Sequence, residues 1–196
     1  MNQLGTIPLQ TDRLLLRRLT FDDCQTMFEH WAGDPQVTRY LRWNAHRDWT
    51  VTAEYLYEVE KCYADPTFYN WGICLKDGTL IGTIGVMRAE RAAGEGWQSL
   101  PLSLHGTEIW EPGYVLGQAW WGQGYATEAL KAVLDFWFDR VDGPWLFICH
   151  ALENPASGRV IQKAGFYYDH DAVYHKYDGT PVPCRAYYIL NPNKEM

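Results

Sequence analysis

The segment Ala119–Phe138 reads AWWGQGYATEALKAVLDFWF and joins two glycines to a run with helical periodicity. Gly122 and Gly124 stand directly before that run, where glycine costs conformational entropy and adds no side-chain packing. The first N–H groups of a helix lack partners within the helix and lie at the positive end of its dipole. Glycines at this point let an anion approach the backbone, because no Cβ stands in the way. The segment therefore predicts either a plain strand-to-helix turn or a phosphate-binding loop.

Two familiar nucleotide-binding patterns do not fit these glycines. A dinucleotide fingerprint needs glycine or alanine three residues after the second glycine, where this chain has Thr127, and it belongs early in a domain. The lysine-bearing pattern G-x-x-x-x-G-K-[ST] is also absent. Spacing therefore argues against both.

The sequence on either side of the glycines predicts further elements. Ile109–Leu116 is typical of a strand, and Pro112 within it requires an edge position or a bulge, because proline has no N–H to donate. After the glycines one apolar stripe indicates a core-facing helix: Leu130, Val133, Leu134, Trp137, Phe138 and Val141. A buried strand, PWLFICHAL, comes next, and a second helix follows it, with Asn154 as cap, Pro155 in the first turn and Gly165 as the stop.

The rest of the chain alternates strands and helices. A strand is expected from Arg13, a helix capped by Thr20 and ended at Gly33–Pro35, and a second helix from about Thr50 to Ala64. A hairpin turns at Asp77-Gly78, a long loop covers 89–107, and two final strands lie near Phe166–His170 and Cys184–Leu190. Hairpins beside helical crossovers predict an α/β (α+β) fold with a mixed sheet, in one domain over 1–196.

Composition narrows the function. The 196 residues carry a formal charge of −7 with no basic cluster, which disfavours a nucleic-acid partner. No stretch resembles a signal peptide or a membrane span, so no membrane partner and a cytoplasmic location are expected. The five cysteines and six histidines have no spacing typical of metal ligands, so we expect no metal and reduced thiols.

GYVLGQAWWGQGYATEAL followed by ENPASGRVIQKAGF resembles the acyl-CoA signature of the GNAT N-acetyltransferase superfamily. The chain is most similar to the branch of ribosomal-protein N-terminal alanine and serine acetyltransferases. LQTDRLLLRRLTFDD resembles the opening strand of that branch, and WGICLKDGTLIGTIG resembles its middle hairpin. The resemblance implies a mostly antiparallel sheet of six to seven strands flanked by about four helices. It also implies a splay between two central parallel strands, Ile109–Leu116 and Trp145–Leu152.

In that family the splay holds acetyl-CoA, which the resemblance implies as the acyl-donor cosubstrate here. The pantetheine arm would pair with the strand edge at Val115 and Leu116. Asn154 matches a family asparagine that hydrogen-bonds this arm, although a helix cap explains the residue equally well. The diphosphate would lie in the loop, on Gly122 and on the backbone N–H groups of Gln123, Gly124, Tyr125, Ala126 and Thr127. One departure is Ala119, where the superfamily often has Gln or Arg; Gln118 stands one place early.

Acetyl transfer to an amine needs a base, because alkyl ammonium has a pKa near 10.4 and an N-terminal amine one near 8. Glu111, on the strand lining the splay, is our first candidate, followed by Glu108 and His150. The family tyrosine that protonates the leaving thiolate is absent, because Ile161 occupies its position. Ser157 matches the serine that part of the family has three residues after the asparagine, and it is our candidate acid.

The sequence therefore predicts an N-acetyltransferase that moves acetyl from acetyl-CoA to a primary amine by direct attack in a ternary complex. The acceptor, a protein N-terminus or a small molecule, stays open, as do longer acyl donors and a monomeric or homodimeric state. A catalytically weak module that binds acyl-CoA as a sensor is the alternative in another class.

Overall fold

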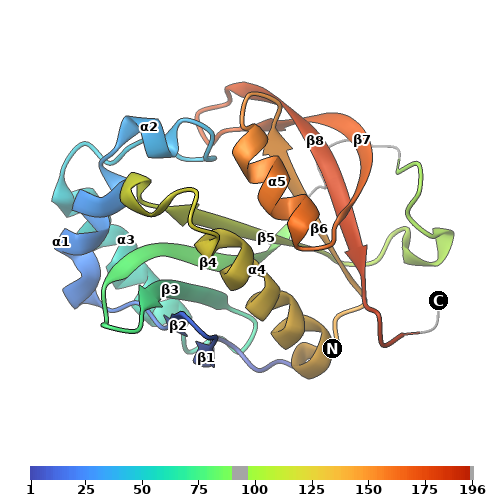
Figure 1. Cartoon of the computed structure of the whole chain (residues 1–196), viewed down its shortest axis with the longest axis horizontal. Coiled ribbons are helices and arrows are strands. Elements are labelled where there is room, and N and C mark those ends of the chain that lie inside the picture. The colour runs from blue at the N-terminus through green and yellow to red at the C-terminus, as the bar shows by residue number, and fades with distance from the viewer. Residues whose placement is uncertain (90–96, 195–196) are drawn as a thin grey trace.

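Figure 1 shows the computed structural model, which describes residues 1–89 and 97–194. Part of the long loop expected over 89–107 therefore lies outside the described residues. Five antiparallel strands form one sheet in chain order: β1 (Leu9–Gln10), β2 (Leu14–Arg17), β3 (Tyr69–Leu75), β4 (Leu80–Ala89) and β5 (Ile109–Leu116). A second, three-stranded sheet has the order β6-β8-β7, with β6 at Trp145–Ala151, β7 at Tyr167–His175 and β8 at Pro181–Leu190.

The predicted fold class is confirmed, with one difference in the sheet. The expected single sheet of six to seven strands is divided between β5 and β6, which lie side by side. Among the described residues no ladder of backbone hydrogen bonds joins these two strands. The division lies at the expected splay. β5 is an edge strand of its sheet and pairs with β4 without a bulge, Pro112 opposite Val86, so the edge position explains how the proline is tolerated.

Helices cover both faces of the larger sheet. The N-terminal helical region consists of η1 (Phe21–Asp23), α1 (Cys24–Met27) and a π turn η2 (Phe28–Ala32), followed by α2 (Pro35–Thr38) and α3 (Trp49–Cys62). α4 (Tyr125–Asp135) continues as a π turn η5 (Phe136–Val141), and α5 (Pro155–Lys163) follows β6. Two short 3-10 turns, η3 (Leu102–Leu104) and η4 (Gln118–Trp120), lie on either side of β5. None of the helices in the described ranges is long and apolar enough to cross a bilayer.

Apolar side chains pack on both faces of the larger sheet, and a third cluster packs around the smaller one. Leu130 and Val133 of α4 pack with β-strand residues such as Trp71 and Ile84. Met27 of α1 and Leu56 of α3 belong to a separate cluster. In Figure 1 α4 and α5 lie in front of the strands, whereas α3 lies behind them.

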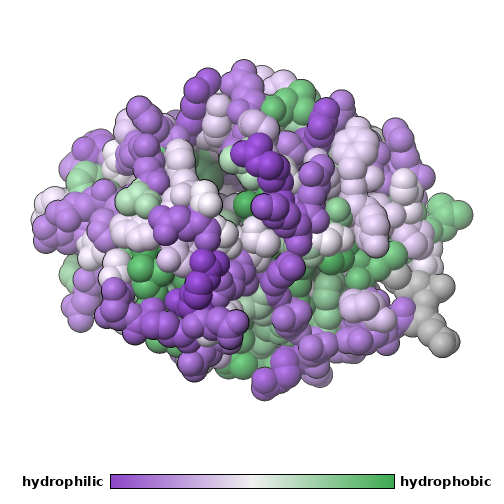
Figure 2. Space-filling view, viewed as in Figure 1, coloured by the Kyte–Doolittle hydropathy of each residue, from purple (hydrophilic) through white to green (hydrophobic). Residues whose placement is uncertain are grey.

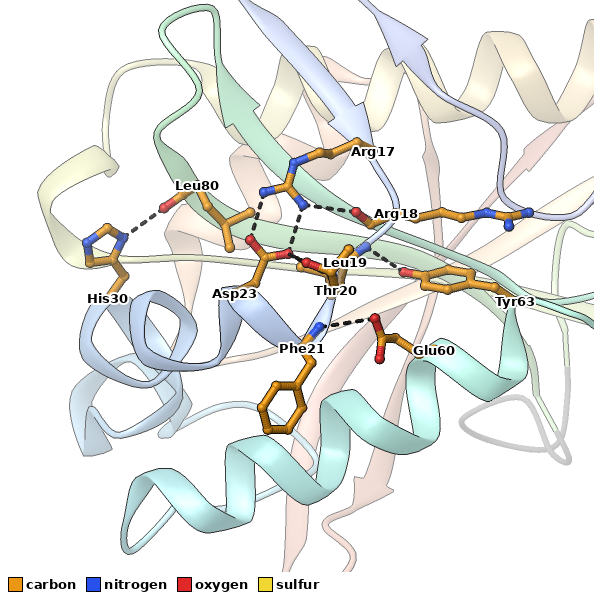
Figure 3. Close-up of polar contacts among 10 residues, drawn as sticks. All are labelled: Arg17, Arg18, Leu19, Thr20, Phe21, Asp23, His30, Glu60, Tyr63 and Leu80. Carbon is orange, nitrogen blue, oxygen red and sulfur yellow. Dashed lines mark hydrogen bonds and ion pairs between the residues drawn. The ribbon is translucent and has the colours of Figure 1, made fainter.

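Polar contacts fix the transition from β2 to the first helical turn (Figure 3). Arg17 grips the Asp23 carboxylate with both terminal nitrogens, at 2.7 and 2.8 Å. The N–H of Thr20 also donates to Asp23 (2.9 Å), as the sequence pattern of a capping box predicts. Burial opposes ionisation of Asp23, but the bonds from Arg17 and Thr20 hold its pKa below the usual value.

Two elements differ from their sequence-based expectation. Gly33–Pro35 ends the first helical region and also starts α2, because Asp34 accepts the Gln36 N–H (2.8 Å) and Pro35 opens the next turn. β7 and β8 are longer than expected and pair as far as His175 opposite Pro181. The turn between them contains Gly179 at φ +87°, a conformation that glycine adopts readily.

Candidate active site

A cavity of about 1390 Å³ runs along the splay between β5 and β6. Figure 2 shows its mouth as a hollow in the surface near α2 and α5. The predicted site residues that line this cavity are Glu111, Val115, Leu116, Gly122, Gly124, Tyr125, Ala126, Thr127, Asn154 and Ser157. Gln123 does not line it. The fold thus brings the two halves of the sequence motif to one space.

The loop before α4 is open and has no side-chain cap. Gly122 (φ +74°) and Gly124 (φ +84°) both adopt left-handed conformations. No side chain caps the helix N-terminus, and the N–H of Glu128 closes the first turn on the Gly124 carbonyl at 3.0 Å. A Cβ built on Gly122 would meet nothing within 4 Å. This end of α4 therefore offers unpaired N–H groups and free space, which fits a phosphate group.

Neither neighbouring glutamine reaches into the open loop. The amide nitrogen of Gln118 donates to Asp34 (2.5 Å), which ties it to the cap of α2. The Gln123 amide folds back onto the Ala119 carbonyl (2.9 Å). Neither glutamine side chain is therefore placed to hold an anion in the loop.

The edge of β5 that faces β6 is the other candidate cofactor surface. Val115 and Leu116 pair with β4 on one side, opposite Thr83 and Gly82. Their other side faces the splay, where the carbonyl of Leu116 accepts the indole N–H of Trp121 (2.7 Å). The outward backbone groups of β5 before Leu116 are therefore the best placed for a strand-like ligand.

Asn154 and Ser157 lie at the start of α5, beside Tyr114 of β5. The Asn154 side chain accepts the Ser157 N–H (3.2 Å), so its helix-cap role is confirmed, while its cofactor contact stays a prediction. The Tyr114 hydroxyl lies 2.8 Å from the Ser157 hydroxyl oxygen. Burial raises the pKa of Tyr114 to about 12. Tyr114 is therefore neutral at physiological pH; its hydroxyl donates to the Ser157 carbonyl oxygen at 3.2 Å, and either hydroxyl can donate to the other.

Glu111 is a buried carboxylate with a cationic partner. Nη2 of Arg42, from the segment between α2 and α3, lies 3.0 Å from one carboxylate oxygen and 3.3 Å from the other. The Cys149 thiol, on β6, is 3.6 Å away. Burial raises the pKa of Glu111, and the contacts with Arg42 and Cys149 offset part of that rise. A carboxylate with a raised pKa inside a cleft is suited to accept a proton.

The other two candidate bases also line the cavity but are less well placed. Glu108 is half exposed and pairs with Arg88 at 2.8 Å. His150 is buried under α5, and both its ring nitrogens have partners, the Ala151 carbonyl (2.8 Å) and the Tyr187 hydroxyl (3.2 Å). Burial lowers the pKa of His150. Glu111 therefore remains the first candidate.

Strand alternation places the candidate base and the candidate acid on opposite faces of β5. Tyr114 packs with the cluster that contains α4, whereas Val115 packs with the cluster that contains α1 and α3. Side chains two residues apart share a face, so Glu111 lies on the Val115 side, toward Arg42. A group held in the splay would then meet Glu111 on one side and the Ser157–Tyr114 pair on the other.

Two residues at this site escaped the sequence analysis. Arg42 lies in an irregular polar segment, and nothing local indicates that it reaches Glu111, 69 positions later. Tyr114 is part of the quoted GYVL stretch, and period-2 alternation from Leu116 could have assigned its face. Within residues 1–89 and 97–194, no group of three or more His, Cys, Asp or Glu side chains could hold a metal ion.

Comparison of the sequence with models of known protein families identifies the family of this chain. The model of the acetyltransferase (GNAT) domain matches residues 13–167, most of the chain. The chain belongs to the GNAT acetyltransferases. The expected family is therefore confirmed, and the protein is an acetyltransferase.

Individual members of the GNAT family align with nearly the whole chain. The uncharacterised N-acetyltransferase YoaA of Bacillus subtilis (strain 168) is 27% identical over 190 residues, covering 95% of this chain and 98% of YoaA. The crystal structure of ribosomal-protein-S5-alanine acetyltransferase from Vibrio fischeri has a TM-score of 0.73 at 14% identity, covering 97% and 100%. Spermidine N-acetyltransferase from Vibrio cholerae, solved with CoA and spermine, has a TM-score of 0.69 at 17% identity. The match covers 92% of this chain and 97% of that protein. Both structural likenesses show the fold.

Proposed function

We propose that this GNAT enzyme transfers acetyl from acetyl-CoA to a primary amine by direct attack within a ternary complex. The observation that carries the proposal is the placement of Glu111 and Ser157 on opposite sides of one cavity. That cavity also includes the uncapped N-terminus of α4. A solved GNAT neighbour that binds CoA and spermine supports acetyl-CoA as donor and an amine as acceptor.

The chain's own residues would divide the work of binding. The glycine loop would hold the diphosphate through backbone N–H groups of residues 124–127, which line the cavity, and the free edge of β5 would align the pantetheine arm. Asn154 has its side-chain nitrogen free of partners in the described part of the chain, so it can donate to that arm. Bound acetyl-CoA supplies an activated thioester, whose position between β5 and β6 these contacts would set.

Glu111 would accept the proton of the attacking amine. Burial makes the carboxylate more basic, and the ion pair with Arg42 across 3.0 Å offsets part of that effect. The face of β5 that carries Glu111 also carries Val115, which packs with α1 and α3, so the acceptor amine would approach from that side. The acceptor is a protein N-terminus or a small-molecule amine, and each has an amine nitrogen from which this base can remove a proton.

Ser157 would donate to the departing sulfur. A free thiol has a pKa of about 8.5, so the thiolate needs only modest stabilisation. When the Tyr114 hydroxyl donates to Ser157, the hydrogen of Ser157 is free to turn toward the splay. The missing family tyrosine at position 161 is thus compensated by a hydroxyl pair from β5 and α5.

A thermal shift tests the cofactor assignment. A ligand at about 100 times its Kd stabilises the folded state by roughly 2.7 kcal/mol, so acetyl-CoA at that excess should raise Tm by several degrees. Release of free CoA across a panel of peptides, polyamines, amino acids and aminoglycosides then identifies the acceptor. No shift at millimolar acetyl-CoA would contradict the donor assignment. A clear shift without CoA release from any amine would favour the sensor alternative.

Removing the hydroxyl of Ser157 tests the proposed acid. Ser157→Ala should lower kcat by about tenfold and leave acetyl-CoA affinity nearly unchanged, because the lost interaction acts on the leaving group. Tyr114→Phe should lower kcat by a similar factor, and the double variant should be little slower than either single one. Steady-state kinetics and calorimetry measure both effects. Fully additive losses in kcat would show that the two hydroxyls act separately.

A further inference from the structure

Arg13, in the turn between β1 and β2, contacts the glycine loop without lining the cavity. Its Nη1 donates to the backbone carbonyl of Gln123 at 2.9 Å. Its Nε and Nη2 both lie 2.6 Å from one carboxylate oxygen of Glu128. The guanidinium also lies over the ring of Tyr125, 4.6 Å from its centre. The Arg13 side chain therefore links the loop to the first turns of α4.

The contact with Gln123 determines where the next N–H group points. In a trans peptide the carbonyl of one residue and the N–H of the next lie in the same plane and point in opposite directions. The chain has no cis peptide bond in its described part, so this holds for Gln123 and Gly124. Arg13 draws the Gln123 carbonyl toward the β1–β2 turn, and Gln123 does not line the cavity. The N–H of Gly124 therefore points away from Arg13, and Gly124 itself lines the cavity.

Glu128 holds Arg13 in the required orientation. Its other carboxylate oxygen accepts the Thr11 hydroxyl (2.6 Å) and the Arg13 backbone N–H (3.0 Å). Burial opposes ionisation of Glu128, but bonds from Thr11 and Arg13 hold its pKa below the usual value. The N-terminal turn, the helix and the loop are therefore joined by one ionised, hydrogen-bonded group, which leaves the guanidinium little rotational freedom.

We infer that Arg13 is a positioning residue for the donor's diphosphate: it fixes the Gln123–Gly124 peptide so that the loop presents its N–H groups to phosphate oxygens. Because this inference rests on the proposed donor, its test separates binding of the nucleotide diphosphate end of acetyl-CoA from binding of the acetylpantetheine end. Direct attraction between Arg13 and the diphosphate is a smaller effect, since the Arg13 side chain is 48% exposed and its charge is screened.

The experiment compares two variants and two donors. Arg13→Gln should weaken CoA binding by about tenfold in calorimetry, the scale of one lost charge-assisted hydrogen bond, and raise KM for acetyl-CoA equally with kcat nearly unchanged. With S-acetylpantetheine, which has no diphosphate, the same variant should match the wild type. Arg13→Lys keeps the charge but loses the planar fork, so it should also bind CoA more weakly than the wild type.

Arg185→Gln is the matched control, because it removes one positive charge from an exposed position of β8 that does not line the cavity. Its CoA affinity should equal that of the wild type. The inference is overturned if Arg13→Gln raises KM equally for both donors, which indicates general loosening, or if Arg13→Lys binds CoA normally, which indicates charge alone. A wild-type protein that binds no CoA overturns the donor assignment itself, and the role of Arg13 with it.

Discussion

Glu111→Gln is expected to lower kcat/KM by about 10²–10⁴-fold, the usual contribution of a positioned general base. The substitution keeps the shape and the hydrogen-bonding oxygen of the side chain but removes its capacity to accept a proton. Glu111 is buried, with 11% of its side chain exposed, so bulk water is poorly placed to replace it. Initial rates of CoA release, with amine and acetyl-CoA varied separately, measure the loss.

The pH dependence of the same variant gives a second, independent readout. Burial raises the pKa of Glu111, so the wild-type rate should increase with pH as this carboxyl loses its proton. The part of that increase that comes from ionisation of Glu111 should be absent in Glu111→Gln. The remaining activity of the variant should grow toward alkaline pH, because more of the amine is then already neutral. The difference between variant and wild type should therefore shrink as the pH rises.

Arg42 adds a related expectation, because its guanidinium opposes the effect of burial on Glu111. Replacing Arg42 with a neutral residue should therefore raise the pKa of Glu111 and move the acid limb of the pH–rate profile to higher pH.

Glu29→Gln, on the exposed face of the first helical region, is a suitable control and should leave the rate and its pH profile unchanged. A Glu111→Gln enzyme with wild-type rates would transfer the role of base to Glu108, His150 or a bound water.

The local features of this fold were accessible from the sequence because each depends on a few neighbouring residues. The glycine loop before α4, the cap at Asn154 and the edge position of Pro112 all follow from backbone chemistry within one segment. The placement of Glu111 on the splay followed from its strand and from the family resemblance. The burial of Glu111 and its ion pair with Arg42 could not be predicted from the sequence.

What the sequence could not supply is contact between distant segments. Arg42 meets Glu111 across 69 positions, and Arg13 meets Gln123 across 110. Neither arginine lies in a periodic pattern that indicates its partner. The splay between β5 and β6 was expected from the family resemblance, but the apolar sequences of the two strands do not by themselves indicate that backbone pairing stops there. Such features depend on packing rather than on propensity.

Gly124→Val is the second variant for which we expect a large effect, and it distinguishes a phosphate cradle from a plain turn. Gly124 has φ +84°, which strongly disfavours a β-branched residue. A Cβ at this position would also lie 3.3 Å from Nη2 of Arg13, the side chain that holds the loop. CoA affinity should therefore fall by at least about tenfold, since both the N–H geometry and the space for a phosphate are lost.

Gly78→Val provides a matched control, because Gly78 has φ +92° in the turn between β3 and β4, with nothing within 4 Å of a built Cβ. Both substitutions force a valine toward a left-handed conformation, at a cost of roughly 1–2 kcal/mol in stability. Circular dichroism and thermal melting should show two folded proteins with lowered Tm. Calorimetry should then show normal CoA binding for Gly78→Val and weak binding for Gly124→Val. If the two folded variants bind CoA equally well, Gly122 and Gly124 form only a turn, and the donor's phosphates must be held elsewhere.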